Sequence, residues 1–183
     1  MDRWDAEVVR ARIHEKAARD PRLAVHGAAD HRYELGQRRT EAEVRAFEEA
    51  HGIRLPESYR SFLTEIGDGG AGPAHGLLPL LDPVPEEHGD EWASVDERRR
   101  DRIPGFLAAP FRFTRHVPIG RVLDSDSSLA GTLTLCEIGC ATFYRLVVNG
   151  PCTGQVWSHD PDWGGFRPGP DFRDWYTAWL DQP

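Results

Sequence analysis

The sequence predicts an α+β fold, in which an antiparallel-rich β-sheet packs against N-terminal helices and a C-terminal helix. Apolar residues recur with helical spacing up to residue 66 and again near the end of the chain. Between residues 111 and 159 the pattern changes to short β-rich segments bounded by Gly, Asp and Ser. A length of 183 residues suits one domain. We therefore expect a single domain over 1–183, with an acidic insert at about 82–105.

The N-terminal part should contain three helices. The first is predicted over residues 5–19. The second begins at a capping box, because Thr40 can accept from a free amide and Glu43 can reach back to it. Gly52 stands where a left-handed cap ends this helix, and Pro56 opens the third. The second and third helices therefore form a helical hairpin.

A glycine-rich loop and the insert follow this hairpin. Residues 67–72 match the letters of the dinucleotide-binding fingerprint, which needs a strand before it and a helix after it. Here a helix precedes and Pro73 follows, so we interpret the loop as a tight turn that binds no cofactor. We interpret the insert as an exposed excursion with a helix around 92–100.

The second half of the chain should form a meander and a final helix. Strands are predicted at 111–113, 117–122, 132–138, 141–149 and 155–159. The connection at 139–140 is too short for a parallel crossover, so its two strands should be antiparallel. A wide apolar stripe predicts a helix over 171–181. Trp157, Phe62 and Trp175 should be buried together, because each lies on the apolar side of its own element.

Charge and hydropathy exclude several classes of protein. The chain has 22 basic and 30 acidic residues, a net charge of −8. That balance argues against a nucleic-acid binder, which needs a cationic surface, and is compatible with a basic partner. Apolar runs are too short to cross a membrane, and the N-terminus shows no secretory signal. We therefore expect a cytoplasmic protein.

The cysteines allow two chemical alternatives, neither of which the spacing favours. Cys136, Cys140 and Cys152 are too few and odd in number for a disulfide scaffold. With His159 they could form a zinc site, but only one pair is suitably spaced, so a role as small buried apolar residues is favoured. Cys140, His159 and Asp162 form a nominal nucleophile set without an activation signature. We predict no catalytic residues, no metal, no cofactor and no enzymatic activity.

Two blocks of sequence resemble a known family. The first has a helix with a Glu, then Leu-Pro, an aromatic residue, Phe-Leu and a Gly-Gly loop. Its residues are Glu48, Leu55, Pro56, Tyr59, Phe62, Leu63, Gly69 and Gly70. The second block is a strand pattern and a terminal helix, with Gly131, Thr132, Leu133, Gly139, Cys140, Leu146, Val147, Val148, Gly150, Gly154, Val156, Trp157, Phe172, Trp175, Trp179 and Leu180. Together they resemble the SUKH superfamily, the SMI/KNR type domain. The insert and Ala141, where the family often has Gly, depart from the pattern.

The resemblance implies an α+β domain without a catalytic site. Bacterial members are regarded as immunity proteins that bind and neutralise toxins, and fungal members regulate cell-wall synthesis through protein contacts. We therefore expect a non-enzymatic protein-binding domain, in the first instance an immunity protein. The alternative is a regulatory or scaffolding domain without a toxin partner. The expected partner is a cognate protein toxin, with a basic nuclease as one candidate, and the chain should be a monomer or weak dimer.

The expected partner-binding face combines the acidic segment 82–97 with the loop 160–163. The acids could occupy the basic surface that a nuclease needs for phosphates, and tryptophans beside them would add apolar contact area. The alternatives are a merely solvated acidic loop and an Asx-turn with Trp163 tucked onto the sheet. The candidate residues are Glu86, Glu87, Asp90, Glu91, Trp92, Asp160, Asp162 and Trp163.

Overall fold

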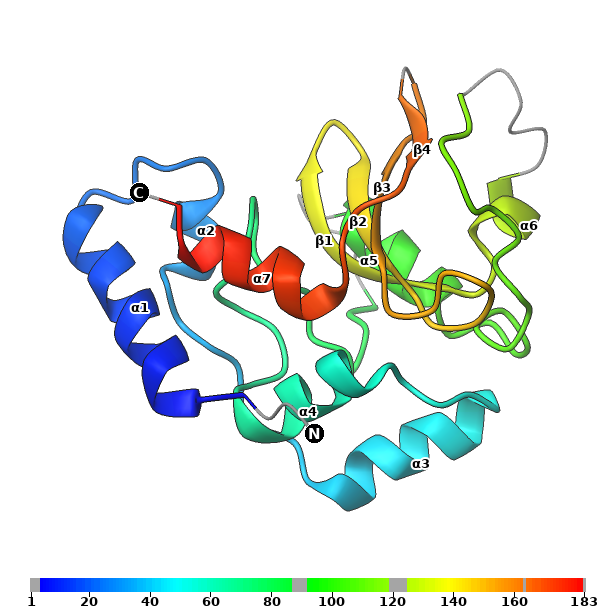
Figure 1. Cartoon of the computed structure of the whole chain (residues 1–183), viewed down its shortest axis with the longest axis horizontal. Helices are drawn as coiled ribbons and strands as arrows, with labels where there is room; N and C mark the ends of the chain where they lie inside the picture. The colour runs from blue at the N-terminus through cyan, green and yellow to red at the C-terminus, as the bar shows by residue number, and fades with distance from the viewer. Residues whose placement is uncertain (1–3, 87–91, 119–124, 163, 183) are drawn as a thin grey trace.

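The computed structural model describes residues 4–86, 92–118, 125–162 and 164–182, and it confirms the α+β fold (Figure 1). The helices are α1 (Ala6–Arg19), α2 (Ala28–His31), α3 (Glu41–His51), α4 (Glu57–Glu65), α5 (Trp92–Arg100), α6 (Ser125–Leu129) and α7 (Phe172–Leu180). The strands are β1 (Thr132–Gly139), β2 (Thr142–Val147), β3 (Val156–Asp160) and β4 (Gly165–Arg167). They form one antiparallel sheet in the order β1-β2-β3-β4. Within the described residues, none of the helices is long and apolar enough to cross a membrane.

The predicted helices are present, and local signals set their ends. In α3 the Thr40 hydroxyl accepts from the Glu43 amide at 3.2 Å, and the Thr40 amide donates to the Glu43 carboxylate at 2.8 Å. This is the predicted capping box, and Gly52 ends the helix with a φ of 64°. The short helices α2 and α6 were not predicted, because so few residues carry no periodic apolar pattern.

Two corrections concern the strands. Residues 111–113 form no strand; instead the Phe111 amide donates to the Asn149 carbonyl at 2.8 Å. Of the predicted strand 117–122, Val117 makes an isolated bridge to Phe166, and residues 119–122 lie outside the described part of the chain. Phe166 itself belongs to β4, which lies in a segment expected to be loop. The two predicted hairpins, β1–β2 and β2–β3, are confirmed.

The sheet is covered on both faces. Arg145 of β2 pairs with Trp157 of β3, so their side chains share one face, where the Trp157 ring lies 5.1 Å from that of Phe111. Tyr144 points to the opposite face, where its ring lies 5.2 Å from that of Trp175 in α7. Trp157, Phe62 and Trp175 are all buried in one connected core, as predicted. However, Trp157 and Trp175 lie on opposite faces of the sheet and are not neighbours.

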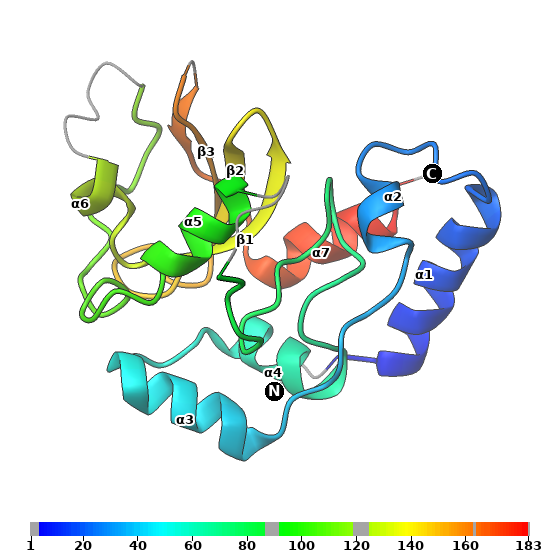
Figure 2. The same cartoon turned by 180° about the vertical axis from the view of Figure 1, so that it is seen from behind.

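The helix inside the insert is confirmed, but its exposure is not. Helix α5 packs on β1, and Figure 2 shows it lying across the strands. Val95 and Arg98 of this helix are buried. The expectation of an exposed excursion is therefore wrong for α5. Glu97 of this helix pairs with Arg145 of β2, and Arg98 donates to the Asp82 carbonyl, contacts that an apolar pattern does not reveal.

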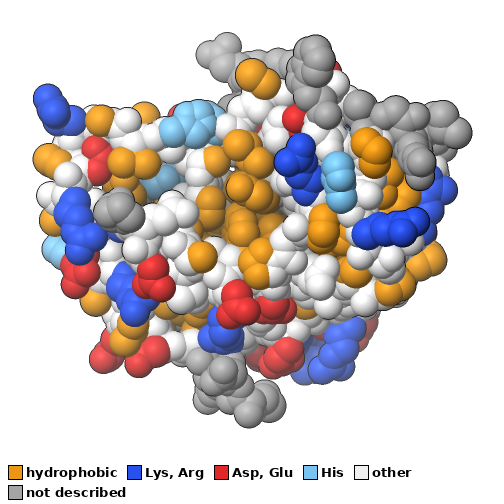
Figure 3. All heavy atoms as spheres, turned by 45° about the horizontal axis from the view of Figure 1, so that its top comes forward, with side chains coloured by type: hydrophobic (Ala, Val, Ile, Leu, Met, Phe, Trp, Pro, Cys, Tyr) orange, Lys and Arg blue, Asp and Glu red, His pale blue; other side chains and the backbone are white. Residues whose placement is uncertain are grey.

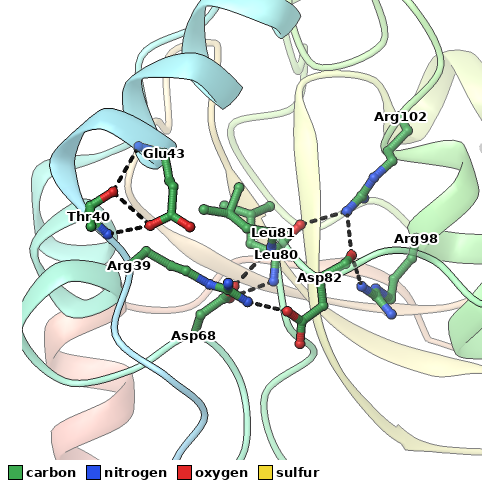
Figure 4. Close-up of polar contacts among 9 residues, drawn as sticks. All are labelled: Arg39, Thr40, Glu43, Asp68, Leu80, Leu81, Asp82, Arg98 and Arg102. Carbon is green, nitrogen blue, oxygen red and sulfur yellow. Dashed lines mark hydrogen bonds and ion pairs between the residues drawn. The ribbon is translucent and has the colours of Figure 1, made fainter.

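The glycine-rich loop is held by a buried carboxylate (Figure 4). Asp68 accepts hydrogen bonds from the amides of Leu80 and Leu81, at 2.6 and 2.9 Å, and from Arg39 at 2.8 Å. Arg39 also pairs with Asp82 at the start of the insert. The loop therefore ties the helical hairpin to the insert. Its glycines allow close backbone contact, because a Cβ on Gly70 would lie 2.2 Å from the Glu34 carbonyl oxygen.

Candidate partner-binding site

Asp96 and Glu97 of the predicted segment 82–97 and Pro161 of the predicted loop 160–163 line one cleft, whereas the described candidates Glu86, Asp160 and Asp162 are not among its lining residues. This insert cleft has a volume of about 220 Å³ and is lined by Asp96, Glu97, Arg100, Phe143, His159 and Pro161, among others. Helix α5 supplies one wall, and the turn between β3 and β4 begins at Pro161. The sequence therefore identified two segments that do lie near each other, although they are far apart along the chain.

The individual candidate residues are placed as follows. Glu86 and Asp162 are exposed, and Asp160 is partly buried. Trp92 begins α5, but its side chain lies outside the described part of the structure. Four further candidates also lie outside the described residues, namely Glu87, Asp90, Glu91 and Trp163. The proposed binding role of all eight residues stays a prediction.

Much of the negative charge of the insert is compensated within the protein. Asp82 pairs with Arg39, and Glu97 pairs with both Arg100 and Arg145. Asp96 lies 3.5 Å from Arg99 on the exposed side of α5. The negative charge expected from the sequence is therefore weaker where these pairs form, because arginines from α5 itself and from distant parts of the chain compensate it.

One part of the simpler alternative, the Asx-turn, is present where the β3–β4 turn begins, and the predicted position of Trp163 lies outside the described residues. The Asp160 carboxylate accepts the amide of Asp162 at 3.0 Å, which is the Asx-turn considered from the sequence. This bond shapes the turn and leaves the Asp162 side chain exposed. A carboxylate is thus presented beside the insert cleft.

Helix α5 is fixed to the sheet by a buried arginine. Arg145 donates to Glu97 at 2.5 Å, to Asp101 at 3.1 Å and to the Thr132 hydroxyl at 2.7 Å. Burial opposes the charged form of Glu97, but Arg145 and Arg100 outweigh it and lower the pKa of that carboxyl. Burial raises the pKa of Asp101, although Arg145 partly opposes this. The cluster positions α5 and so one wall of the insert cleft.

His159 is buried and lines this cleft. Its ring stacks on Phe166 with 4.5 Å between centroids. Burial, reinforced by the positive charge of Arg145, lowers the pKa of His159 to about 4, so the imidazole is neutral at neutral pH. Its Nδ1 atom has no hydrogen-bond partner in the described structure, so Asp162 does not orient the ring through that atom.

The cysteines behave as separate residues. Cys136 is buried, and burial raises the pKa of its thiol well above the usual range. Cys140 is exposed in the β1–β2 turn. Among the described residues, no group of three or more His, Cys, Asp or Glu side chains could hold a metal ion.

A second concave surface was not predicted from the sequence. This aromatic groove has a volume of about 390 Å³ and is lined by Lys16, His31, Ile138, Tyr144, Trp179 and Gln182, among others. It lies between the helical part and the hairpin β1–β2. Figure 3 shows hydrophobic side chains gathered in the hollow at the centre of one face of the molecule, between cationic and histidine side chains. The sequence offered one signal for it, since Lys16 is the only lysine in the chain.

Comparison with known proteins gives one match. The model of the SMI1 / KNR4 family (SUKH-1) matches residues 39–178. The matched range includes the first motif block, the insert and the second motif block up to Trp175, and it ends within α7, before Trp179 and Leu180. No curated protein and no solved structure gives a significant match.

Proposed function

The chain belongs to the SMI1 / KNR4 family (SUKH-1), and from this premise we propose that it is a non-enzymatic immunity protein that binds and neutralises a cognate toxin. The observation that carries the proposal is the family match over residues 39–178, because this family is associated with binding to other proteins.

The insert cleft is the proposed contact for the toxin. Helix α5 is held rigidly by Arg145, so a partner would meet a preformed surface. Glu86 and Asp162 present exposed carboxylates from the two segments that form this region. Opposite charge on a basic toxin would mainly raise the association rate, and salt would weaken the effect.

The product of the neighbouring open reading frame is the first partner to test. We expect it to bind the purified protein in a calorimetric titration, and we expect co-expression to protect cells from its toxicity. Binding without protection would favour a regulatory or scaffolding role. If the neighbouring product neither binds nor is neutralised, the proposed immunity function fails for that pair of genes.

Charge reversal then tests the contact surface. Replacing Glu86, Glu87, Asp90 and Glu91 with lysine should slow association with the toxin and flatten its salt dependence. Glu49→Lys is the matched control, because Glu49 is an exposed acid on α3. An unchanged rate and salt slope in the fourfold variant would contradict the electrostatic contribution, without affecting the proposal that the protein binds a toxin.

A further inference from the structure

The only lysine of the chain is buried in the aromatic groove. Lys16 is 8% exposed, and its Nζ atom donates to the main-chain carbonyl of Gln182 at 2.7 Å. The ammonium also lies 5.2 Å from the centroid of the Trp179 ring. Every other cation outside the histidines is an arginine. Lys16 therefore brings a compact positive charge into a cavity whose floor is aromatic.

This ammonium has no carboxylate partner. Within the described structure, no Asp or Glu lies within ion-pair distance of Nζ, and the neighbouring acids have other partners. The Asp20 carboxylate accepts from the Ala24 amide at 2.7 Å and from the Tyr33 hydroxyl at 3.0 Å, and Asp181 pairs with Arg12. Burial, together with the nearby Arg19, lowers the pKa of Lys16, and Asp181 only partly opposes this.

The buried Arg145 has carboxylate partners, which Lys16 does not have among the described residues. Arg145 has two carboxylates within hydrogen-bond distance, Glu97 and Asp101. Burying a charge is costly unless an opposite charge or strong hydrogen bonds compensate it. Among the described residues, Lys16 contacts one neutral carbonyl and one aromatic face, so two of its three N–H donors have no acceptor there.

The rest of the groove supplies apolar contact area. Trp179 forms part of the wall, and Tyr144 and Ile138 come from the β1–β2 hairpin on the other side. A volume of about 390 Å³ is within the usual range for ligand-binding cavities. The apolar walls and the Lys16 ammonium together suit a ligand that has a flat apolar part and a carboxylate a few atoms away.

We propose that the aromatic groove binds a segment of the protein partner in which an aromatic side chain is followed by an Asp or Glu. The aromatic ring packs between Trp179 and Tyr144, and the side-chain carboxylate accepts hydrogen bonds from the Lys16 ammonium. This inference rests on the proposed protein-binding function and gives the partner a second, chemically distinct contact. Because the groove and the insert cleft lie on opposite sides of the sheet, one partner could hold the β1–β2 hairpin from both sides.

A pair of nearly isosteric peptides tests the proposal without the natural partner. N-acetyl-Phe-Glu-amide and N-acetyl-Phe-Gln-amide differ by one charge, and each is titrated into ¹⁵N-labelled protein while the Trp179 indole N–H resonance is followed. A Trp179→Phe spectrum assigns that resonance. We expect saturable shifts with a millimolar Kd for the Glu peptide and about tenfold weaker binding for the Gln peptide, since a charge-assisted hydrogen bond is lost.

Substitutions of Lys16 then test whether its ammonium causes the preference for the Glu peptide. Lys16→Met keeps the apolar stem of the side chain and should abolish the preference for Glu over Gln, and Lys16→Gln provides a second variant if the first unfolds. Arg45→Met removes an exposed cation on α3 and should keep the preference. Equal binding of both peptides, no shift of Trp179 up to about 10 mM, or a preference that survives in Lys16→Met would overturn the inference.

The neighbouring gene product separates this inference from the proposed function. If it binds the wild-type protein and binds Lys16→Met at least about tenfold more weakly, the groove contact is supported. If it binds both equally, the groove inference fails and the immunity proposal stands. If it binds neither while the Glu peptide binds selectively, the carboxylate site is real and the proposed partner is wrong.

Discussion

Replacing Arg145 with methionine should destabilise the protein strongly. The Arg145 side chain is 1% exposed, and its guanidinium contacts Glu97, Asp101 and Thr132. Methionine fills much of the same space but offers no hydrogen bonds. Asp101, whose side chain is 3% exposed, would keep the bond from the Thr134 amide at 2.9 Å and lose its ion pair with Arg145.

Removing one partner of a buried ion pair usually costs about 3–5 kcal/mol, because the remaining charge is left uncompensated. Glu97 would retain Arg100, so Asp101 should account for most of the loss. For a chain of this length, a loss of that size lowers Tm by roughly 6–20 °C. Helix α5 should also become detached from β1 more often, which would expose the insert to proteases.

The cost should depend on pH in a defined direction. The folded-state pKa of Glu97 is lowered, so its stabilising effect is present above its unfolded pKa and is lost as the pH falls. The pKa of Asp101 is raised, so the cost of its charge disappears as the pH falls through the folded value. Asp101 behaves in this way already in the wild-type protein, and losing Arg145 should raise its pKa further, so acid relieves a larger cost in the variant. The difference in stability between the wild-type protein and the variant should shrink between about pH 7 and pH 4.

Urea unfolding followed by tryptophan fluorescence measures this difference at each pH. Arg100→Met is the matched control, because Arg100 pairs with the same Glu97 but is 23% exposed and should cost less. Asp101→Asn in the Arg145→Met background should restore part of the stability by removing the stranded charge. A loss below about 1 kcal/mol for Arg145→Met, or no rescue by Asp101→Asn, would refute this account of the cluster.

Three further predictions follow from the fold. Ala141→Gly should raise the free energy of unfolding by about 0.5–1 kcal/mol, because Ala141 has a φ of 55° in the β1–β2 turn, and a thermal melt with no increase in Tm would contradict this. Trp157→Ala should cost about 3–5 kcal/mol in urea unfolding, since the ring is fully buried against Phe111, and a loss under about 1 kcal/mol would be inconsistent with that packing. The loop 67–72 should bind neither ATP, NAD nor FAD in calorimetry, because its amides and the Asp68 carboxylate serve internal contacts, and a saturable micromolar isotherm would disprove the structural interpretation.

The sequence alone determined those features whose interacting residues lie close together along the chain. The two residues of the capping box, Thr40 and Glu43, lie within one helical turn, and the apolar stripe of α7 lies within a single helix. The short connection after Gly139 leaves only an antiparallel pairing for β1 and β2. The two motif blocks also lie in contiguous stretches, so the family could be identified without coordinates.

The segments of the insert cleft were predicted, but their charge state and burial were not. The seven acids in 82–97 indicated an acidic surface without compensating cations. In the folded chain, however, Arg39 pairs with Asp82 and Arg145 pairs with Glu97, although these arginines are distant in sequence. Helix α5 has little apolar periodicity, so the sequence does not show that it covers the sheet through the Glu97–Arg145 ion pair and the hydrogen bond from Ser94 to Glu137.

Tertiary structure alone decided which face of the sheet each core residue occupies and where the aromatic groove lies. Strand alternation places Trp157 and Val156 on opposite faces, but it does not say which layer covers which face. Phe111 looked like part of a strand and instead packs as a loop residue on Trp157. Lys16 and Trp179 are separated by most of the chain, and they meet because α1 and α7 pack together. Local sequence determines the helices and strands. Their packing against one another is stabilised by burial and charge compensation between residues that only the folded chain brings together.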